Sequence, residues 1–414
     1  MVYFLIVLSV SAVVTYLLTP PVRRLGLRLG IYTPIRSRDI HTEVKPRWGG
    51  VAIYLGMVAG LGVAAGIPYL SGLFSDLTPV IGVLTAMTLI LITGMADDAW
   101  DIHWAIKLAV QISCGLILVL HGIRLEVMPV GWLGVGGPLL QGFLTVFLVV
   151  MTINAFNFID GLDGLAAGVA AIGGSAFFLY SYMLALSIQE FDASNLVTLL
   201  MAVLIGSCLG FLPHNFHPSN VLMGDTGAML LGLVMVAGAL IVTASLELHQ
   251  ETFRFRNIPA YMPVLLPLTV MILPLLDLIL AVLRRAARRT SPFSPDRGHL
   301  HHKLIDSGYS HPQAVLLLYL WAAIFAFGSV SFNFLPWQAV LLAMALAFAA
   351  ATALTLGPWM RQWIGRINPA AAFKPSALPG TGHDADLDEA DQLPQTDEST
   401  GPADRPHSSR NGDV

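Results

Sequence analysis

Two carboxylates and two carboxamides lie within one short, glycine-containing segment: Asn154, Asn157, Asp160 and Asp163. The segment separates two long apolar runs in a chain that is 55% hydrophobic and only 12% charged. Acidic groups at the end of a membrane span are costly unless the protein uses them. Because carboxylate and amide oxygens suit hard cations, the segment predicts a divalent cation and, through it, phosphate chemistry.

The same segment also allows a structural interpretation. Asp160 and Asp163 are spaced i, i+3, which places both on one face if the segment is helical. Asp160 could then simply cap the N-terminus of the apolar helix that follows, which is a common use of Asp. Capping does not explain Asn154 and Asn157 at the end of the preceding run, so we favour the functional interpretation.

A second acidic group, Asp97 and Asp98, ends another apolar run, and Lys107 follows within the next one. Adjacent carboxylates repel each other, so keeping both ionised requires a cation or strong hydrogen-bond donors. Acids solvated at a helix end are the alternative, and solvation alone accounts for Asp101. The nearby Lys107 favours a functional pair.

A third acidic position, Asp225, opens an apolar run within the sequence Met-Gly-Asp-Thr-Gly at 223–227. A helix start offers free N–H groups and a positive dipole end, which suit phosphate, while Asp225 could hold Mg²⁺. The alternative is a helix cap, with the glycines serving close packing.

Three histidines, His299, His301 and His302, lie between Arg297 and Lys303. No Cys or nearby acid completes a recognisable tetrahedral zinc set. Donors to pyrophosphate and sugar oxygens fit this basic segment better, and a solvated basic loop is the alternative.

Two further positions are more ambiguous. Arg47, two residues after Lys45, suits an anionic headgroup or lipid phosphate at the membrane surface, although the bias for basic residues on the cytoplasmic side explains it equally well. Asp277 lies inside an apolar run and is a functional candidate, unless it pairs with the basic end of its own helix.

The chain has 414 residues and a mean hydropathy of +0.71, which excludes a soluble globular protein. Repeated apolar runs match the bilayer thickness and predict an all-α polytopic membrane protein with about 11 transmembrane helices. Both cysteines, Cys114 and Cys208, lie inside apolar runs and predict no disulfide framework. The predicted spans are 2–19, 49–67, 78–95, 104–121, 138–155, 164–183, 195–212, 223–245, 262–283, 313–331 and 335–356.

Lys and Arg gather in the connections after the first and ninth predicted spans. The positive-inside rule therefore places the N-terminus outside and the C-terminus in the cytoplasm. The acidic, amide and histidine groups described above all fall at connections on that same cytoplasmic face, whereas Asp277 lies inside a predicted span. A transporter, the competing class of function, would place polar groups near the midplane, often in inverted repeats, and no repeat is visible.

The remaining segments are predicted from composition. Apolar and polar residues alternate weakly in the segment 124–137, which also contains turn residues. This pattern predicts a short β-hairpin on the outer side of the membrane. We expect a membrane-embedded domain at 1–360 and a disordered polar cytoplasmic tail at 361–414, because that tail is rich in Pro, Asp, Glu, Ser and Thr.

These motifs, in this order, resemble the polyprenyl-phosphate N-acetylhexosamine-1-phosphate transferases. The resemblance runs from about residue 20 to 330. The resemblance rests on five motifs: Pro46–Gly50, Asp97–Asp98 with Lys107, Asn154–Gly164, Met223–Gly227 and His299–His302.

The resemblance implies a Mg²⁺-dependent enzyme, with Mn²⁺ as a substitute, that moves a sugar-1-phosphate from a UDP-sugar to a prenyl phosphate and releases UMP. It implies a bacterial cytoplasmic membrane location, with a homodimer as a possibility and no nucleic-acid partner. The His-x-His-His form resembles the branch that uses UDP-GlcNAc, and the stretch 211–217 resembles relatives whose lipid is decaprenyl rather than undecaprenyl phosphate.

The resemblance also implies roles for individual residues. Metal binding falls to Asn157 and Asp225. Catalytic roles fall to Asp97, Asp98, Lys107, His301 and His302. Substrate-binding roles fall to Arg47, Asn154, Asp160, Asp163, Asn215, Arg297 and His299.

Two positions depart from the family pattern. Leu222 stands where relatives usually have a Phe near the uracil, and Asn220 stands where a Lys or a similar residue is common. We therefore expect uridine binding to be weaker or to use other residues.

Overall fold

A computed structural model describes residues 1–32, 45–125, 137–188, 193–248, 269, 271–287 and 300–367. These residues form helices and contain no β-strand, apart from one isolated bridge between Tyr32 and Pro46. The all-α prediction is therefore confirmed for the described chain. The possible hairpin at 124–137 lies almost entirely outside the described residues.

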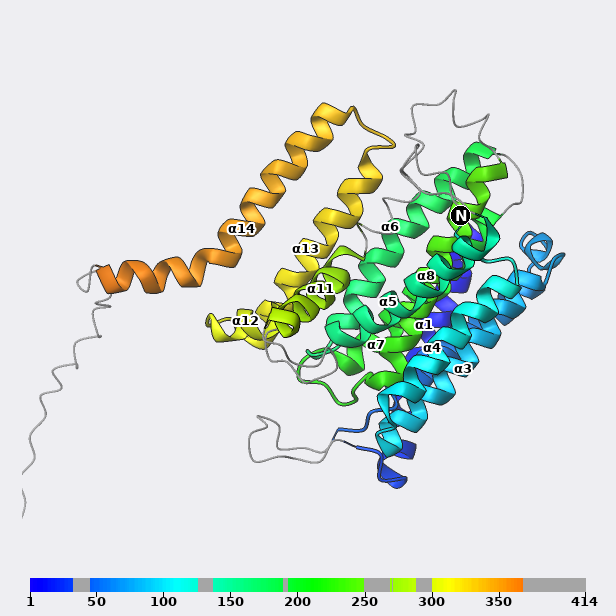
Figure 1. Ribbon diagram of the computed structural model, residues 1–414, viewed down its shortest axis with the longest axis horizontal. Helices are drawn as coiled ribbons and strands as arrows, with labels where there is room; N and C mark the ends of the chain where they lie inside the picture. The colour runs from blue at the N-terminus through cyan, green and yellow to red at the C-terminus, as the bar shows by residue number, and fades with distance from the viewer. Residues whose placement is uncertain are drawn as a thin grey trace, which may run out of the picture. The chain divides into compact units, whose positions relative to one another are not determined.

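Figure 1 shows the helices of the described chain. They are α1 (Val2–Arg28), α2 (Gly49–Gly66), the short 3₁₀ helix η1 (Ser71–Phe74), α3 (Thr78–Trp100), α4 (Trp104–Leu120), α5 (Pro138–Ile159), α6 (Leu165–Ile188), α7 (Ala193–Asn215), α8 (Gly224–Leu248), α11 (Ile272–Ala287), α12 (Leu300–Asp306), α13 (His311–Ser331) and α14 (Trp337–Ile367).

Nine helices of the described chain are long and apolar enough to cross a membrane: α1, α2, α3, α5, α6, α7, α8, α13 and α14. The protein is therefore a multi-pass membrane protein. The apolar helix α4 has 17 residues and α11 has 16, so both are shorter than a typical span. A total of eleven spans remains a prediction.

The chain divides into two units, Met1–Trp363 and Ile364–Val414. The second unit is described only as far as Ile367, where α14 ends. The predicted tail at 361–414 therefore lies mostly outside the described residues, and its disorder remains a prediction.

The centre of the first unit is formed by α7 and α8. The apolar window of α8 is fully buried and that of α7 is 83% buried, whereas that of α14 is only 11% buried. The helices α2, α3, α5 and α7 all pack against α8, and α1 and α6 pack against α7 (Figure 1). The apolar part of α8 is thus enclosed by several other helices.

The N-termini of α2 and α8 approach each other unusually closely. A Cβ atom on Gly50 would lie 2.2 Å from the backbone nitrogen of Gly227. The N–H groups of Gly49 and Gly50, which have no partner inside their own helix, donate to the carbonyl oxygens of Leu222 and Met223 at 3.1 Å each. Small residues allow backbones to meet in this way within a membrane.

We predict that Gly50→Ala destabilises the protein by at least about 2 kcal/mol, because the added methyl group meets backbone that cannot move aside. The matched control is Gly62→Ala, on the same helix, where a Cβ would meet nothing within 4 Å. Thermal unfolding in detergent should show a clear loss for Gly50→Ala only. Equal melting temperatures for the two variants would contradict this account of the crossing.

Candidate active site

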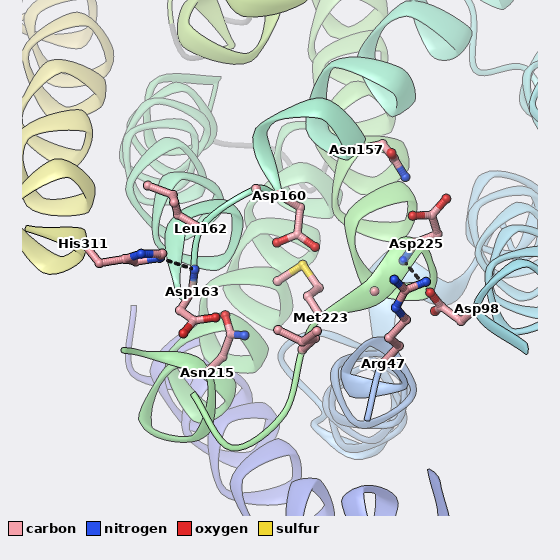
Figure 2. Close-up of a pocket in the computed structure, with 13 residues that line it drawn as sticks. Arg47, Asp98, Asn157, Asp160, Leu162, Asp163, Asn215, Met223, Asp225 and His311 are labelled. Carbon is pink, nitrogen blue, oxygen red and sulfur yellow. Dashed lines mark hydrogen bonds between the residues drawn. The ribbon is translucent and has the colours of Figure 1, made fainter. Parts of the chain in front are cut away.

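A cavity of about 310 Å³ collects polar residues from the ends of several helices (Figure 2). The C-terminal ends of α3, α5 and α7 meet there with the N-terminal ends of α8 and α13. The lining residues are Arg47, Asp98, Asn157, Asp160, Gly161, Leu162, Asp163, Asn215, Leu222, Met223, Gly224, Asp225 and His311. Most acidic and amide residues singled out in the sequence therefore lie in one place.

Asp98, at the end of α3, caps the N-terminus of α8. Its Oδ1 atom accepts the backbone N–H of Asp225 at 3.1 Å, the bond drawn dashed in Figure 2. Its Oδ2 atom accepts the backbone N–H of Thr226 at 3.1 Å and the Thr226 hydroxyl at 2.5 Å. Gly224, the residue before Asp225, has a φ of +71°, a backbone conformation that favours glycine. A catalytic role for Asp98 remains a prediction, since both oxygens already hold α8 in place.

Asp225 follows this cap and lies among polar groups from three other helices. The Lys107 ammonium on α4 lies 3.2 Å from Oδ2 of Asp225 and 2.9 Å from Oδ2 of Asp97. The side-chain amide of Asn157 on α5 points toward the Asp225 carboxylate (Figure 2). One ammonium therefore faces two carboxylates and leaves an excess of negative charge.

This oxygen-rich arrangement fits a hard divalent cation. Asp225 and Asn157 both line the cavity, and carboxylate and amide oxygens are ligands that Mg²⁺ accepts. Oδ1 of Asp97 is buried and has no hydrogen-bond partner among the described residues. A buried carboxylate oxygen without a donor is costly unless a cation, a proton or a ligand satisfies it.

Asp160 lies in the turn between α5 and α6 and is partly buried. Burial raises the pKa of Asp160 to about 8, and the negative charges of Asp225 and Asp98 add to this shift. The interpretation of Asp160 as the N-cap of the next helix is wrong, because Asp160 ends α5 and α6 begins only at Leu165. For the same reason Asp160 and Asp163 do not share a helical face.

Asp163 is held at the opposite end of the cavity by basic and polar groups. Its Oδ2 atom accepts from the Lys45 ammonium, the Ser219 backbone N–H and Nδ1 of His217, each at 3.2 Å. Burial alone would raise the pKa of Asp163, but the bonds from Ser219 and the Lys45 charge outweigh burial and hold this pKa below its ordinary value. Asp163 is therefore a carboxylate already neutralised by protein groups.

His311 is a cavity residue that the sequence did not indicate. Its Nε2 atom accepts the backbone N–H of Asp163 at 3.3 Å, and its ring stacks on that of His217 with centroids 4.6 Å apart. His311 is the first residue of α13 and belongs to none of the motifs. Lys45 and His217 were not assigned to the site either, because only the fold brings them to Asp163.

Two predicted substrate-binding residues make structural contacts. Asn215 lines the cavity, but its Oδ1 accepts the N–H of Gly164 at 3.0 Å and its Nδ2 donates to the Val221 carbonyl at 2.9 Å. Asn154 is not among the lining residues, and its amide donates to Oε1 of Gln111 on α4 at 2.6 Å. Substrate contact by either residue remains a prediction.

The predicted basic cluster is only partly described. Arg297 and His299 lie outside the described residues. His301 and His302 belong to the short helix α12, but their side chains are not described. Their predicted roles at the diphosphate and sugar end are therefore still predictions.

A second group of potential metal ligands is formed by Asp163, His217 and His311, whose ligand atoms lie within 4.8 Å of one another. The Lys45 ammonium already bonds to the carboxylate oxygen of this group. The group near Asp225 carries the larger unbalanced negative charge, so we place the cation there.

We predict that Asp98→Ala lowers the free energy of unfolding by about 1 to 3 kcal/mol, because it leaves two N–H groups and a hydroxyl without an acceptor. Thr226→Val removes only the hydroxyl bond and should cost about 1 kcal/mol. Thermal unfolding in detergent can compare the two variants. Unchanged stability of Asp98→Ala would exclude the cap as a structural element.

Comparisons with known proteins place the chain among related sequences. The profile of glycosyl transferase family 4 matches residues 80–244. The chain is 40% identical over 362 residues to the decaprenyl-phosphate N-acetylglucosaminephosphotransferase of Mycolicibacterium smegmatis, covering 85% of this chain and 87% of the relative.

More distant relatives also align over most of their length. One is the probable undecaprenyl-phosphate N-acetylglucosaminyl 1-phosphate transferase of Bacillus subtilis, which is 30% identical, with 80% of this chain and 85% of the relative covered. Another is the undecaprenyl-phosphate alpha-N-acetylglucosaminyl 1-phosphate transferase of Escherichia coli K12, which is 27% identical, with 79% and 84% covered.

Proposed function

The chain belongs to glycosyl transferase family 4, and on that premise we propose that it transfers GlcNAc-1-phosphate from UDP-GlcNAc to a membrane polyprenyl phosphate. The products are a prenyl-diphosphate-linked sugar and UMP, and the reaction is a first membrane step of cell-envelope glycopolymer synthesis. The observation that carries this proposal is Asp225, held by the α8 cap beside Lys107 and Asn157 in a cavity.

The reaction is a displacement at phosphorus. An oxygen of the prenyl phosphate attacks the β-phosphorus of UDP-GlcNAc, the bond from that phosphorus to the bridging oxygen breaks, and UMP leaves with that oxygen. Such transfers depend on positioning and on charge neutralisation more than on covalent chemistry by the protein. Mg²⁺, or Mn²⁺ in its place, would supply positive charge to the diphosphate when bound by Asp225 and Asn157.

The protein's own groups divide the remaining tasks. Lys107 offsets phosphate charge next to Asp225, and Arg47 supplies a second cation at the cavity wall. Asp97 does not line the cavity, but its buried oxygen Oδ1 has no hydrogen-bond partner among the described residues and would take a proton from a monoanionic lipid phosphate that reaches it. Most lipid phosphate is dianionic at neutral pH, so this proton transfer serves a minor population.

Several further features belong to the same proposal. The protein resides in the bacterial cytoplasmic membrane with the cavity facing the cytoplasm, the N-terminus outside and the tail inside. Decaprenyl phosphate is the favoured acceptor, because relatives at 40% identity carry that name. Arg297 and the histidines 299, 301 and 302 complete the sugar and diphosphate end, and a homodimer is the expected assembly.

We predict that purified protein converts UDP-GlcNAc and prenyl phosphate to lipid-linked GlcNAc phosphate and UMP only when Mg²⁺ is present. Asp225→Ala should reduce turnover to background because it removes the charged metal ligand, while thermal unfolding shows a folded protein. The control is Asp101→Asn. Asp101 is exposed and lies outside the cavity, and Asn tolerates its φ of +50°. The assay measures radiolabelled lipid product.

Three outcomes of this assay would change the proposal. Appreciable turnover by Asp225→Ala would remove Asp225 as metal ligand. Activity with another UDP-HexNAc or with UDP-MurNAc-pentapeptide, but not with UDP-GlcNAc, would change the donor. A trapped covalent phospho-sugar on an Asp would replace direct attack by a two-step route.

We also predict that Mg²⁺ binding releases a proton at pH 7. Asp160 is protonated below its pKa of about 8. A cation bound near Asp225 lowers that pKa and drives the proton off. Calorimetric titration with Mg²⁺ in buffers of different ionisation enthalpy should detect the release. It should decrease in Asp160→Asn, and it should vanish in the native protein at pH 9.5. Mg²⁺ binding without proton release at pH 7 would contradict the assignment.

A further inference from the structure

The cavity contains polar groups for phosphate and metal but very little aromatic surface. Among the lining residues that the structure describes, His311 is the sole aromatic ring. The neighbouring wall residues Leu222 and Met223 are aliphatic, and Leu222 stands at the position where the family pattern has an aromatic ring. A planar heterocycle that enters this cavity therefore meets one aromatic side chain among these residues, His311.

The ring of His311 is held in a fixed orientation. His217 stacks on it with an interplanar angle of 16°, and the N–H of Asp163 donates to its Nε2. The backbone is fixed as well, because Ser310 and Gln313 form a capping box at the start of α13. His217 is not a lining residue, so it supports the His311 ring from outside the cavity.

The surroundings of His311 differ from those of Asp225. At the Asp225 end the negative charge is only partly balanced, which suits a cation and the diphosphate. At the His311 end Asp163 is neutralised by Lys45 and Ser219, so no net charge needs a counter-ion. An uncharged planar group fits this end better than a phosphate does.

We propose that His311, supported by His217, is the surface on which the nucleobase of the donor stacks. This inference rests on the proposed function, which makes a uridine diphosphate sugar the donor. Stacking of a base on an aromatic side chain corresponds to about a 5- to 150-fold change in affinity. His311 thereby supplies the aromatic contact that Leu222 cannot make.

The first test compares His311→Ala with His311→Phe in the transferase assay. Removing the ring should raise KM for UDP-GlcNAc at least about fivefold with a smaller change in kcat, because the base is remote from the reacting phosphorus. His311→Phe keeps a stacking surface and should stay within about threefold of the native KM. Leu222→Phe introduced into His311→Ala should recover part of the loss.

The control is His214→Ala. His214 also packs its ring against an aromatic side chain, Tyr16, with centroids 4.8 Å apart, but it does not line the cavity. Its replacement should leave KM for UDP-GlcNAc unchanged. An equal rise in KM in His214→Ala and His311→Ala would mean that the effect is general to histidine removal, and the proposal would fall.

A second test measures binding without turnover. Stabilisation of the purified protein against heat by UMP should weaken in His311→Ala and persist in His311→Phe, while inhibition by GlcNAc-1-phosphate should not change. This readout does not require transferase activity. A native protein that binds UMP but makes no lipid product would defeat the proposed reaction and leave the stacking surface standing.

Two results would overturn the stacking surface itself. One is unchanged UMP stabilisation and unchanged KM in a folded His311→Ala variant. The other is a His311→Phe variant as impaired as His311→Ala, which would show that the imidazole acts through its hydrogen bond to Asp163 rather than through its face.

Discussion

The capping of α8 by Asp98 is the interaction on which the site depends. A helix that begins inside a protein leaves its first N–H groups without partners, and a carboxylate is a strong acceptor for them. Here the acceptor comes from the end of α3 and holds the residues Asp225 and Thr226 directly. The position of the proposed metal ligand is thus set by the contact between two helix ends, and the positive end of α8 stabilises negative charge nearby.

The N-terminus of α2 also finds acceptors for its free N–H groups, in the segment that precedes α8. The free N–H groups at the start of α2 donate to the carbonyl oxygens of Leu222 and Met223, and the N–H of Leu222 donates to the Pro46 carbonyl at 2.9 Å. The segment before α8 is therefore paired by backbone bonds to the segment before α2. These bonds require the glycines at 49 and 50, because side chains there would separate the two segments.

Much of the site could be predicted because its residues end or begin apolar runs. Asp98, Asn157 and Asp225 lie in connections on one side of the membrane by sequence reasoning, and they share one cavity in the structure. The sequence left open an N-cap at Asp160, since the start of α6 depends on the turn at 160–164 and not on local capping preference. His311 could not be found at all, because nothing near it in the sequence reveals its stacking on His217.

The polar contact between Gln111 and Asn154 has a consequence for how the chain can vary in length. Both amides lie between α4 and α5, and Gln111 is only 3% exposed. This pair fixes how each helix is rotated about its own axis, because buried amides must keep their partners. One residue inserted between Asn154 and Asn157 would turn Asn157 by about 100° away from Asp225. The helical stretches from Lys107 to Gln111 and from Asn154 to Asn157 must therefore keep their lengths.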